Sequence, residues 1–135
     1  MEIRIQHLGD VKFTATTRGH SIVCDQPVAN GGSDSGMTPP ELLLASLGTC
    51  AGFYAAQFLK NHALSQVGLE VVVNAEKAAA PARLAKFRVE IFAPGLPAEH
   101  EAGILRAVNA CLVKNTLAQS PTIETTLHTH ALAPV

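Results

Sequence analysis

A stretch of eighteen residues without a formal charge, 42–59, restricts most strongly how this chain can fold. Thr38 is a favoured N-cap residue, Pro39 suits the first helical turn, and Glu41 stands three residues after Thr38, which together make a capping box. We therefore predict a helix that begins after Thr38 and ends near His62. Because apolar residues occur on nearly all its sides, such a helix must be enclosed.

The same stretch is just long enough to cross a bilayer. It carries serine, threonine and glutamine, however, and the sequence on both sides is amphipathic. These features favour a buried central helix over a membrane span. Gly48 and Gly52 would let another backbone approach this helix closely, and our hypothesis is that the neighbour is the same helix of a second subunit.

Alternating apolar residues predict strands on both sides of the central helix. The first 26 residues indicate a three-strand antiparallel meander, followed by an irregular mobile loop at 27–37. The pattern then predicts two strands joined as a hairpin, a second helix and a last strand, at residues 67–77, 84–92, 95–111 and 122–132. This order indicates an α+β fold in a single domain, residues 1–135, and excludes a simple parallel sheet.

Charge and cysteine content argue against several classes of protein. The 10 Lys and Arg and 11 Asp and Glu are scattered without runs, so neither nucleic acid nor an anionic membrane is an expected partner. Three cysteines in a chain that begins without the pattern of a signal peptide suggest a reducing cytoplasm.

Two cysteines lie on predicted helices. Cys50 falls inside the apolar run, and Cys111 continues the buried stripe of Ile104 and Val108 at the i, i+4, i+7 spacing. This placement suggests thiol redox chemistry rather than a disulfide scaffold, although buried cysteine also serves as an inert small hydrophobe. Cys24, in a predicted strand, is interpreted as ordinary packing.

Three blocks of sequence resemble the OsmC/Ohr family, and specifically its OsmC-like proteins. They are residues 18–27, residues 31–50 and residues 111–117. The resemblance covers essentially the whole chain and implies an intertwined α+β homodimer, in which antiparallel sheets wrap the long central helices. It also implies thiol-dependent reduction of organic hydroperoxides, with Cys50 as the peroxidatic cysteine and Cys111 as the resolving one.

The sequence departs from the family pattern at two positions. Proline usually follows the second cysteine, whereas Leu112 stands here and changes the local turn. In the hydroperoxide-resistance branch, the carboxylate that pairs with the active-site arginine lies one position earlier, where this chain has Pro40. Glu41 matches the broader OsmC-like pattern instead.

A peroxidatic cysteine must be a thiolate, and burial alone raises its pKa. A guanidinium at about 4 Å would contribute on the order of 4 kcal/mol at an effective dielectric near 20, and Arg18 is our candidate for it. Glu41 lies nine residues before Cys50, which is half a turn out of phase on an ideal helix. It could cap the helix or orient Arg18 across a subunit interface.

The sequence thus favours a cytosolic peroxidase without a bound cofactor or metal, re-reduced by a dithiol, possibly a lipoylated protein, as the resemblance implies. One alternative is a non-catalytic OsmC-like redox sensor or apolar-ligand-binding module. Another is an acyl-thioester enzyme, for which no acid and general-base pair is evident. His128 and His130 could form half of a metal site, but no second pair accompanies them.

Overall fold

A three-stranded antiparallel sheet forms the N-terminal part of the chain. In the computed structural model, which describes residues 1–134, its strands are β1 (Arg4–Gly9), β2 (Lys12–Thr17) and β3 (His20–Cys24). They pair in the order β1-β2-β3, with Ala15 opposite Ile5 on one side and Ile22 on the other. The predicted meander is therefore confirmed.

The loop after β3 is held by a buried carboxylate. Asp25 is 1% exposed and accepts hydrogen bonds from the backbone N–H groups of Gln26 (2.8 Å), Ser33 (3.1 Å) and Ser35 (3.1 Å), and from the Ser35 hydroxyl (2.7 Å). The Ser35 hydroxyl contributes most to holding the pKa of Asp25 far below its usual range. Residues 27–37, which we expected to be mobile, thus have a fixed path that includes the short 3₁₀ helix η1 (Val28–Asn30).

The central helix has the predicted bounds. α1 (Pro39–Asn61) is capped by Thr38 at its start and His62 at its end, and the Thr38 N–H donates to the Glu41 carboxylate at 2.8 Å. One stripe of α1 is buried, at Leu47, Ala51, Ala55 and Leu59. The capping box and the helix are confirmed, but within one chain only this stripe of the apolar surface is covered.

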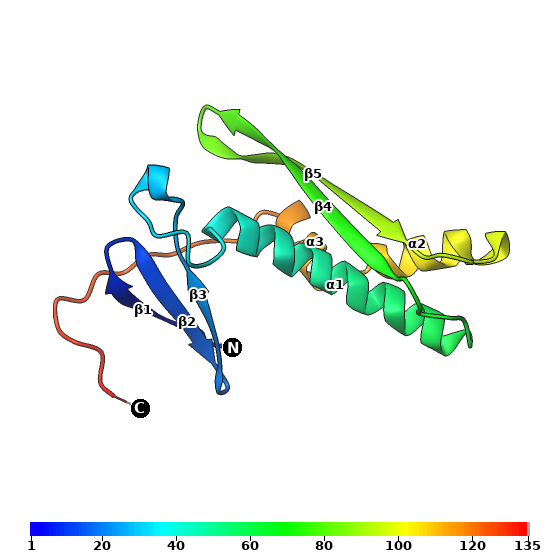
Figure 1. The fold of residues 1–135 in the computed structure, drawn as a ribbon, viewed down its shortest axis with the longest axis horizontal. Coiled ribbons are helices and arrows are strands. Elements are labelled where there is room, and N and C mark those ends of the chain that lie inside the picture. The colour runs from blue at the N-terminus through cyan, green and yellow to red at the C-terminus, as the bar shows by residue number, and fades with distance from the viewer. Residues whose placement is uncertain (135) are drawn as a thin grey trace.

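A long hairpin and a second helix cover that stripe. β4 (Glu70–Ala79) and β5 (Ala82–Phe92) pair antiparallel, as predicted. The η2 turn (Ala98–His100) leads into α2 (Glu101–Asn109), whose Ile104 and Val108 join the α1 stripe in the core. Figure 1 shows the hairpin running across α1, well separated from the three-stranded sheet beyond the N-terminal end of that helix.

The C-terminal part of the chain differs from our expectation in two ways. The second helix is interrupted after Asn109, and a separate helix, α3 (Leu112–Ala118), begins directly after Cys111. The strand predicted at 122–132 is wrong, because residues 121–128 and 131–134 have no regular structure and 129–130 form a bend. A strand forms only where its backbone pairs with a neighbouring strand, and in the described chain this exposed segment pairs with none.

The chain exposes much more surface than a compact protein of its size. Its accessible surface is 10113 Å², whereas a globular chain of 14.2 kDa is expected to expose about 6,800 Å². Much of the excess is apolar. Large hydrophobic side chains that are exposed include Ile5, Phe13, Ile22, Met37, Phe53, Val72 and Phe92.

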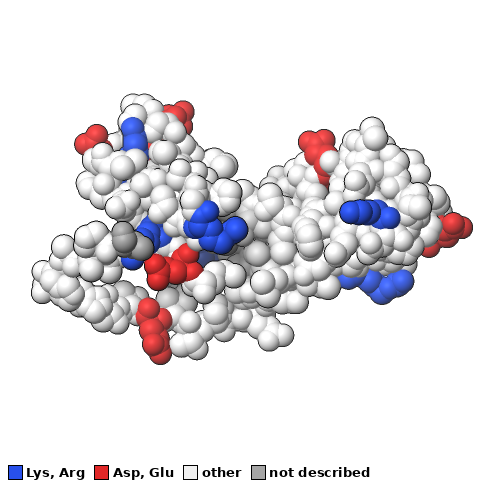
Figure 2. All heavy atoms as spheres, turned by 90° about the horizontal axis from the view of Figure 1, so that it is seen from below, with Lys and Arg blue, Asp and Glu red and all other residues white. Residues whose placement is uncertain are grey.

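By length and composition α1 could cross a bilayer. The core helix of a soluble protein meets the same criteria, and the buried stripe of α1 packs on α2 and the hairpin of its own chain. Figure 2 shows acidic and basic residues dispersed singly or in small mixed groups over the face in view. We therefore treat α1 as a core helix.

The close neighbour of the two helix glycines is β4 of the same chain. A Cβ atom at Gly48 would lie 2.9 Å from Val73 Cγ2, and one at Gly52 would lie 3.6 Å from Val71 Cγ2. We therefore replace the hypothesis that these glycines let the helix of a second subunit approach with the hypothesis that they let the β4–β5 hairpin pack closely on α1. Only Gly48 is tight enough to exclude a methyl group without movement of its neighbour.

We predict different effects of alanine at these two positions. Gly52→Ala should raise the free energy of unfolding by about 0.5–1 kcal/mol, because alanine is the better helix former and meets only an ordinary contact. Gly48→Ala, the matched control, should show no such gain because Val73 must move. Urea unfolding at a fixed protein concentration measures both, and a clear loss of stability in Gly52→Ala would restore the hypothesis of a helix from a second subunit.

Candidate functional site

The structure brings together the two cysteines that the sequence singled out. Cys50 lies in the middle of α1 and is half-buried, and Cys111 lies between α2 and α3 and is 1% exposed. Each thiol is near enough to shift the pKa of the other. Both are free, so the site contains a neighbouring dithiol.

Cys111 owes its position to the break between the two C-terminal helices. It is the N-cap residue of α3, with φ −54° and ψ 124°, and its Sγ accepts a hydrogen bond from the Lys114 N–H at 3.4 Å. Its carbonyl accepts the Asn115 N–H at 3.0 Å. The start of α3 thereby fixes Cys111 against α1.

The two thiols have different acidities. Partial burial raises the pKa of Cys50, but the Cys111 thiol and the backbone N–H groups of Val113 and Leu112 outweigh it, so the net pKa lies below the ordinary value. Burial and the Cys50 sulfur both raise the pKa of Cys111, and the N–H groups of Lys114 and Val113 offset this only in part. Cys50 is therefore the sulfur that ionises first.

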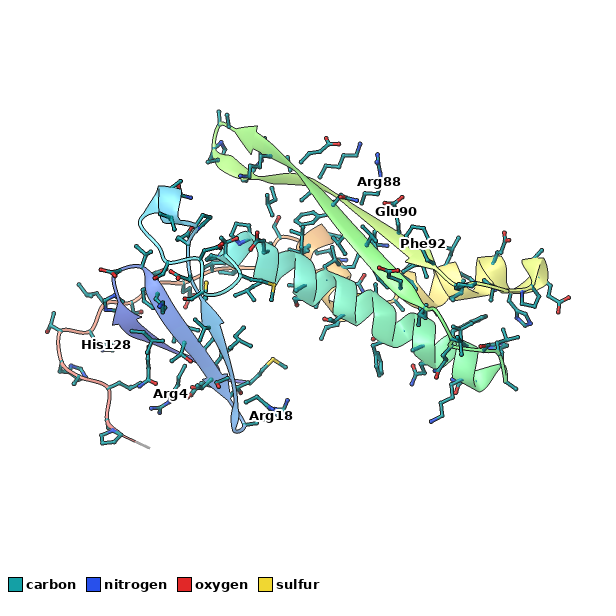
Figure 3. The ribbon with its side chains drawn as sticks, viewed as in Figure 1. Arg4, Arg18, Arg88, Glu90, Phe92 and His128 are labelled. Atoms are coloured by element: carbon teal, nitrogen blue, oxygen red, sulfur yellow. The ribbon has the colours of Figure 1, made fainter. Side chains whose placement is uncertain are left out.

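Arg18 does not contribute to this acidity within one subunit. It lies in the turn between β2 and β3, in the left-handed conformation with φ 50°. Figure 3 shows it at the tip of that hairpin, away from α1. The groups that shift the pKa of Cys50 include no charged side chain, so the pairing of Arg18 with Cys50 stays a prediction about an interface.

Glu41 has the capping role in this chain. Its carboxylate accepts the Thr38 N–H, about two and a half turns before Cys50 on the same helix. The second role considered for it, orienting Arg18 across an interface, stays a prediction.

Sequence analysis missed the backbone donors that surround the sulfurs. We expected a cation to stabilise the thiolate, whereas the structure uses the N–H groups of Leu112 and Val113. The signal that could have found them is the break itself, because the first N–H groups of any helix lack partners within it.

An apolar groove opens beside Cys111. It encloses about 650 Å³ between α1, β5, α2 and α3. Leu47, Phe87 and Val89 contribute to its apolar lining. Lys114 and Asn109 also line the groove, and Lys114 Nζ donates a hydrogen bond to Asn109 Oδ1 at 2.6 Å. In the part of the chain that the structure describes, no three His, Cys, Asp or Glu side chains are grouped to hold a metal.

Comparison with known proteins identifies the family. The family model described as OsmC-like protein matches residues 32–126. The chain belongs to the OsmC-like protein family. No curated protein matches the chain.

Solved structures with the same fold are distant in sequence. A putative osmotic stress induced and detoxification response protein from Psychrobacter arcticus has a TM-score of 0.76 and 22% identity, over 84% of this chain and 85% of that one. An OsmC-like protein from Mycoplasma pneumoniae has a TM-score of 0.73 and 21% identity, over 88% and 87%. An organic hydroperoxide resistance protein OsmC from Legionella pneumophila has a TM-score of 0.61 and 18% identity, over 86% and 87%. At these identities the likeness confirms the OsmC-like α+β fold.

The different pKa values of Cys50 and Cys111 lead to a prediction that can be tested without a substrate. In the reduced protein, alkylation of Cys50 by iodoacetamide should reach its plateau at a lower pH than alkylation of Cys111, which is buried and has a raised pKa. Peptide mass spectrometry follows each cysteine separately. Cys111→Ala should move the Cys50 profile to higher pH, whereas Cys111→Ser keeps a donor and should move it less. A Cys50 profile at or above the pH of the Cys111 profile would contradict the assignment.

Proposed function

We propose that this protein is a thiol-dependent peroxidase that reduces organic hydroperoxides to alcohols. The observation that supports the proposal best is the pair of unequal thiols, in which a partly accessible Cys50 with a lowered pKa lies beside a buried Cys111 with a raised pKa. A peroxidase needs this combination, because one sulfur must attack as a thiolate and the other must stay protonated until it is required.

In the proposed reaction the Cys50 thiolate attacks the outer oxygen of ROOH. The O–O bond breaks, the alcohol leaves after taking up a proton, and Cys50 becomes a sulfenic acid. The Cys111 thiol then attacks this sulfur, which forms a disulfide and releases water. A dithiol, possibly on a lipoylated protein, returns both cysteines to thiols by exchange and is itself oxidised to a disulfide.

The surroundings of the dithiol suit an apolar substrate. The groove beside Cys111 is lined mainly by apolar side chains of α1, β5 and α3, and these would receive the alkyl part of the hydroperoxide. Family membership and the solved organic hydroperoxide resistance proteins of the same fold, from Legionella pneumophila and Elizabethkingia anophelis, support the same reaction class. We propose a cytoplasmic location, in keeping with three free cysteines.

Serine variants test the roles of the two cysteines. Cys50→Ser should abolish consumption of cumene hydroperoxide with a dithiol reductant, while Cys111→Ser should complete about one turnover and leave Cys50 open to sulfinic acid formation. Peroxide assays and intact-protein mass spectrometry measure these outcomes, and Cys24→Ser is the matched control that should behave as wild type. Equal steady-state rates in wild type and Cys50→Ser would reject the peroxidase. Fast oxidation of Cys50 in stopped flow without turnover would instead favour the redox sensor.

We also propose that the active molecule is a homodimer. Each chain exposes 10113 Å², about 3,300 Å² more than a compact chain of its mass, and this exceeds the roughly 800 Å² that each partner buries in a standard interface. Association of two copies would cover the exposed apolar faces of α1 and the sheets. It would also allow Arg18 of one copy to reach Cys50 of the other, with Glu41 orienting it.

A charge on the uncovered face of α1 should separate the two copies. Phe53 is 58% exposed in the middle of the helix, so Phe53→Glu should lower the mass in sedimentation equilibrium from twice 14.2 kDa towards 14.2 kDa. The control Phe53→Leu keeps the site apolar and should leave the dimer intact. A wild-type mass of one chain at micromolar concentration would refute the homodimer.

A further inference from the structure

The three-stranded sheet is joined to α1 through a short loop, residues 25–37. Among the described residues, the elements that pack extensively on α1 are α2, α3 and the β4–β5 hairpin, and no strand of this sheet is one of them. The C-terminal tail reaches β1 at residues 132–134, but without strand pairing. The direction in which β3 leads into α1 (Figure 1) therefore depends mainly on how this loop is folded.

Backbone contacts close the two ends of the loop on each other. The Asp25 N–H donates to the Met37 carbonyl at 3.3 Å, and Cys24, the last residue of β3, forms a parallel bridge with Met37. Met37 directly precedes Thr38, the N-cap residue of α1. The end of β3 and the start of α1 are thus held side by side.

The Asp25 carboxylate holds the rest of the loop from inside. Its Oδ2 accepts the Ser33 N–H, the Ser35 N–H and the Ser35 hydroxyl, and its Oδ1 accepts the Gln26 N–H. A carboxylate suits this place because it accepts several hydrogen bonds and carries no donor of its own. Because Asp25 is buried, a bond lost here is not simply replaced by one to bulk water.

The backbone of the loop lies in direct contact with the residues that precede it. A Cβ atom at Gly32 would overlap the Gln26 carbonyl, and one at Gly36 would overlap the Val23 carbonyl. Close packing and the bonds to Asp25 together make the loop a joint rather than a slack connection.

We propose that Asp25 is a positioning residue, whose carboxylate makes this loop a rigid joint that fixes the three-stranded sheet, and Arg18 with it, relative to α1. The inference rests on the proposed function only in the use of Arg18 at Cys50 of a second copy. β3 is five residues long, which places the Arg18 turn about 17 Å from the joint. A rotation of about 10° at the joint moves that turn by about 3 Å, which is comparable with the length of an ion pair.

Asp25→Asn and Asp34→Asn are a matched pair of probes. Asparagine at position 25 keeps the size of the side chain but turns an NH₂ group towards N–H donors, so at least one hydrogen bond is lost. Asp34 lies in the same loop and is exposed, and asparagine tolerates its left-handed φ of 55°. The control therefore removes the same charge and leaves the bonds to Asp25 intact.

Residual dipolar couplings of the backbone amides measure how the sheet is oriented relative to α1 in the full-length, reduced protein. In wild type and Asp34→Asn, one alignment tensor should fit both β1–β3 and α1. In Asp25→Asn the couplings of β1–β3 should be smaller than that tensor gives, because the sheet then moves about the joint. A single tensor that fits Asp25→Asn, or an equal loss in both variants, would overturn the proposal.

A measurement on the wild-type protein decides the matter if Asp25→Asn does not fold. The amide protons of Ser33 and Ser35 should exchange with solvent at least about tenfold more slowly than in an unstructured peptide, because Asp25 accepts both. Exchange at the unstructured rate would reject the rigid joint.

Alkylation of Cys50 shows whether Asp25 acts through Arg18. Arg18→Ala should slow alkylation at neutral pH by about tenfold, the effect of one pKa unit. Asp25→Asn should slow it by about threefold and add nothing in the Arg18→Ala background, while Asp34→Asn should match wild type. Additive effects, or an unchanged rate in Arg18→Ala, would overturn the positioning role.

None of these measurements uses a peroxide. Positive results with no peroxide turnover would therefore reject the proposed function and leave the role of Asp25 standing.

Discussion

The candidate dithiol site depends on the break between α2 and α3. Because α2 ends at Asn109 and α3 begins at Leu112, the chain turns at Cys111 and places its thiol where it shifts the pKa of Cys50 on α1. Had the second helix continued without a break, its N–H groups at this point would be satisfied internally. The break supplies both the second thiol and the free donors around the first.

The helices and strands that a local sequence pattern determines were predictable. The capping box at Thr38 and Glu41 gave the start of α1, and strand alternation gave the three-strand meander and the β4–β5 hairpin. The helix α3 was not predictable in this way, because the apolar stripe of Ile104, Val108 and Cys111 meets a polar residue, Asn115, at its next position. Likewise, the alternation of apolar residues at 122–132 gives a strand only where that segment pairs with the edge of a sheet.

The candidate site shows the same division. The two cysteines could be found from the sequence because thiols are rare and the blocks around them resemble a family. The pKa shifts of these cysteines could not be found from the sequence, because they arise in part from backbone donors, which every residue type but proline carries. Asp25 was missed for a related reason, since its burial under the loop depends on how residues 33 and 35 fold back onto it.

Two ways of stabilising the Cys50 thiolate can therefore act together. The donors from Cys111, Val113 and Leu112 are present in one chain and are short-ranged, so they lower the pKa before any partner is bound. A guanidinium from a second copy would add an attraction that depends on association and is weakened by solvent at a partly exposed sulfur. If the protein is a peroxidase as proposed, the single subunit would favour Cys50 as the attacking cysteine, and dimerisation would raise its reactivity.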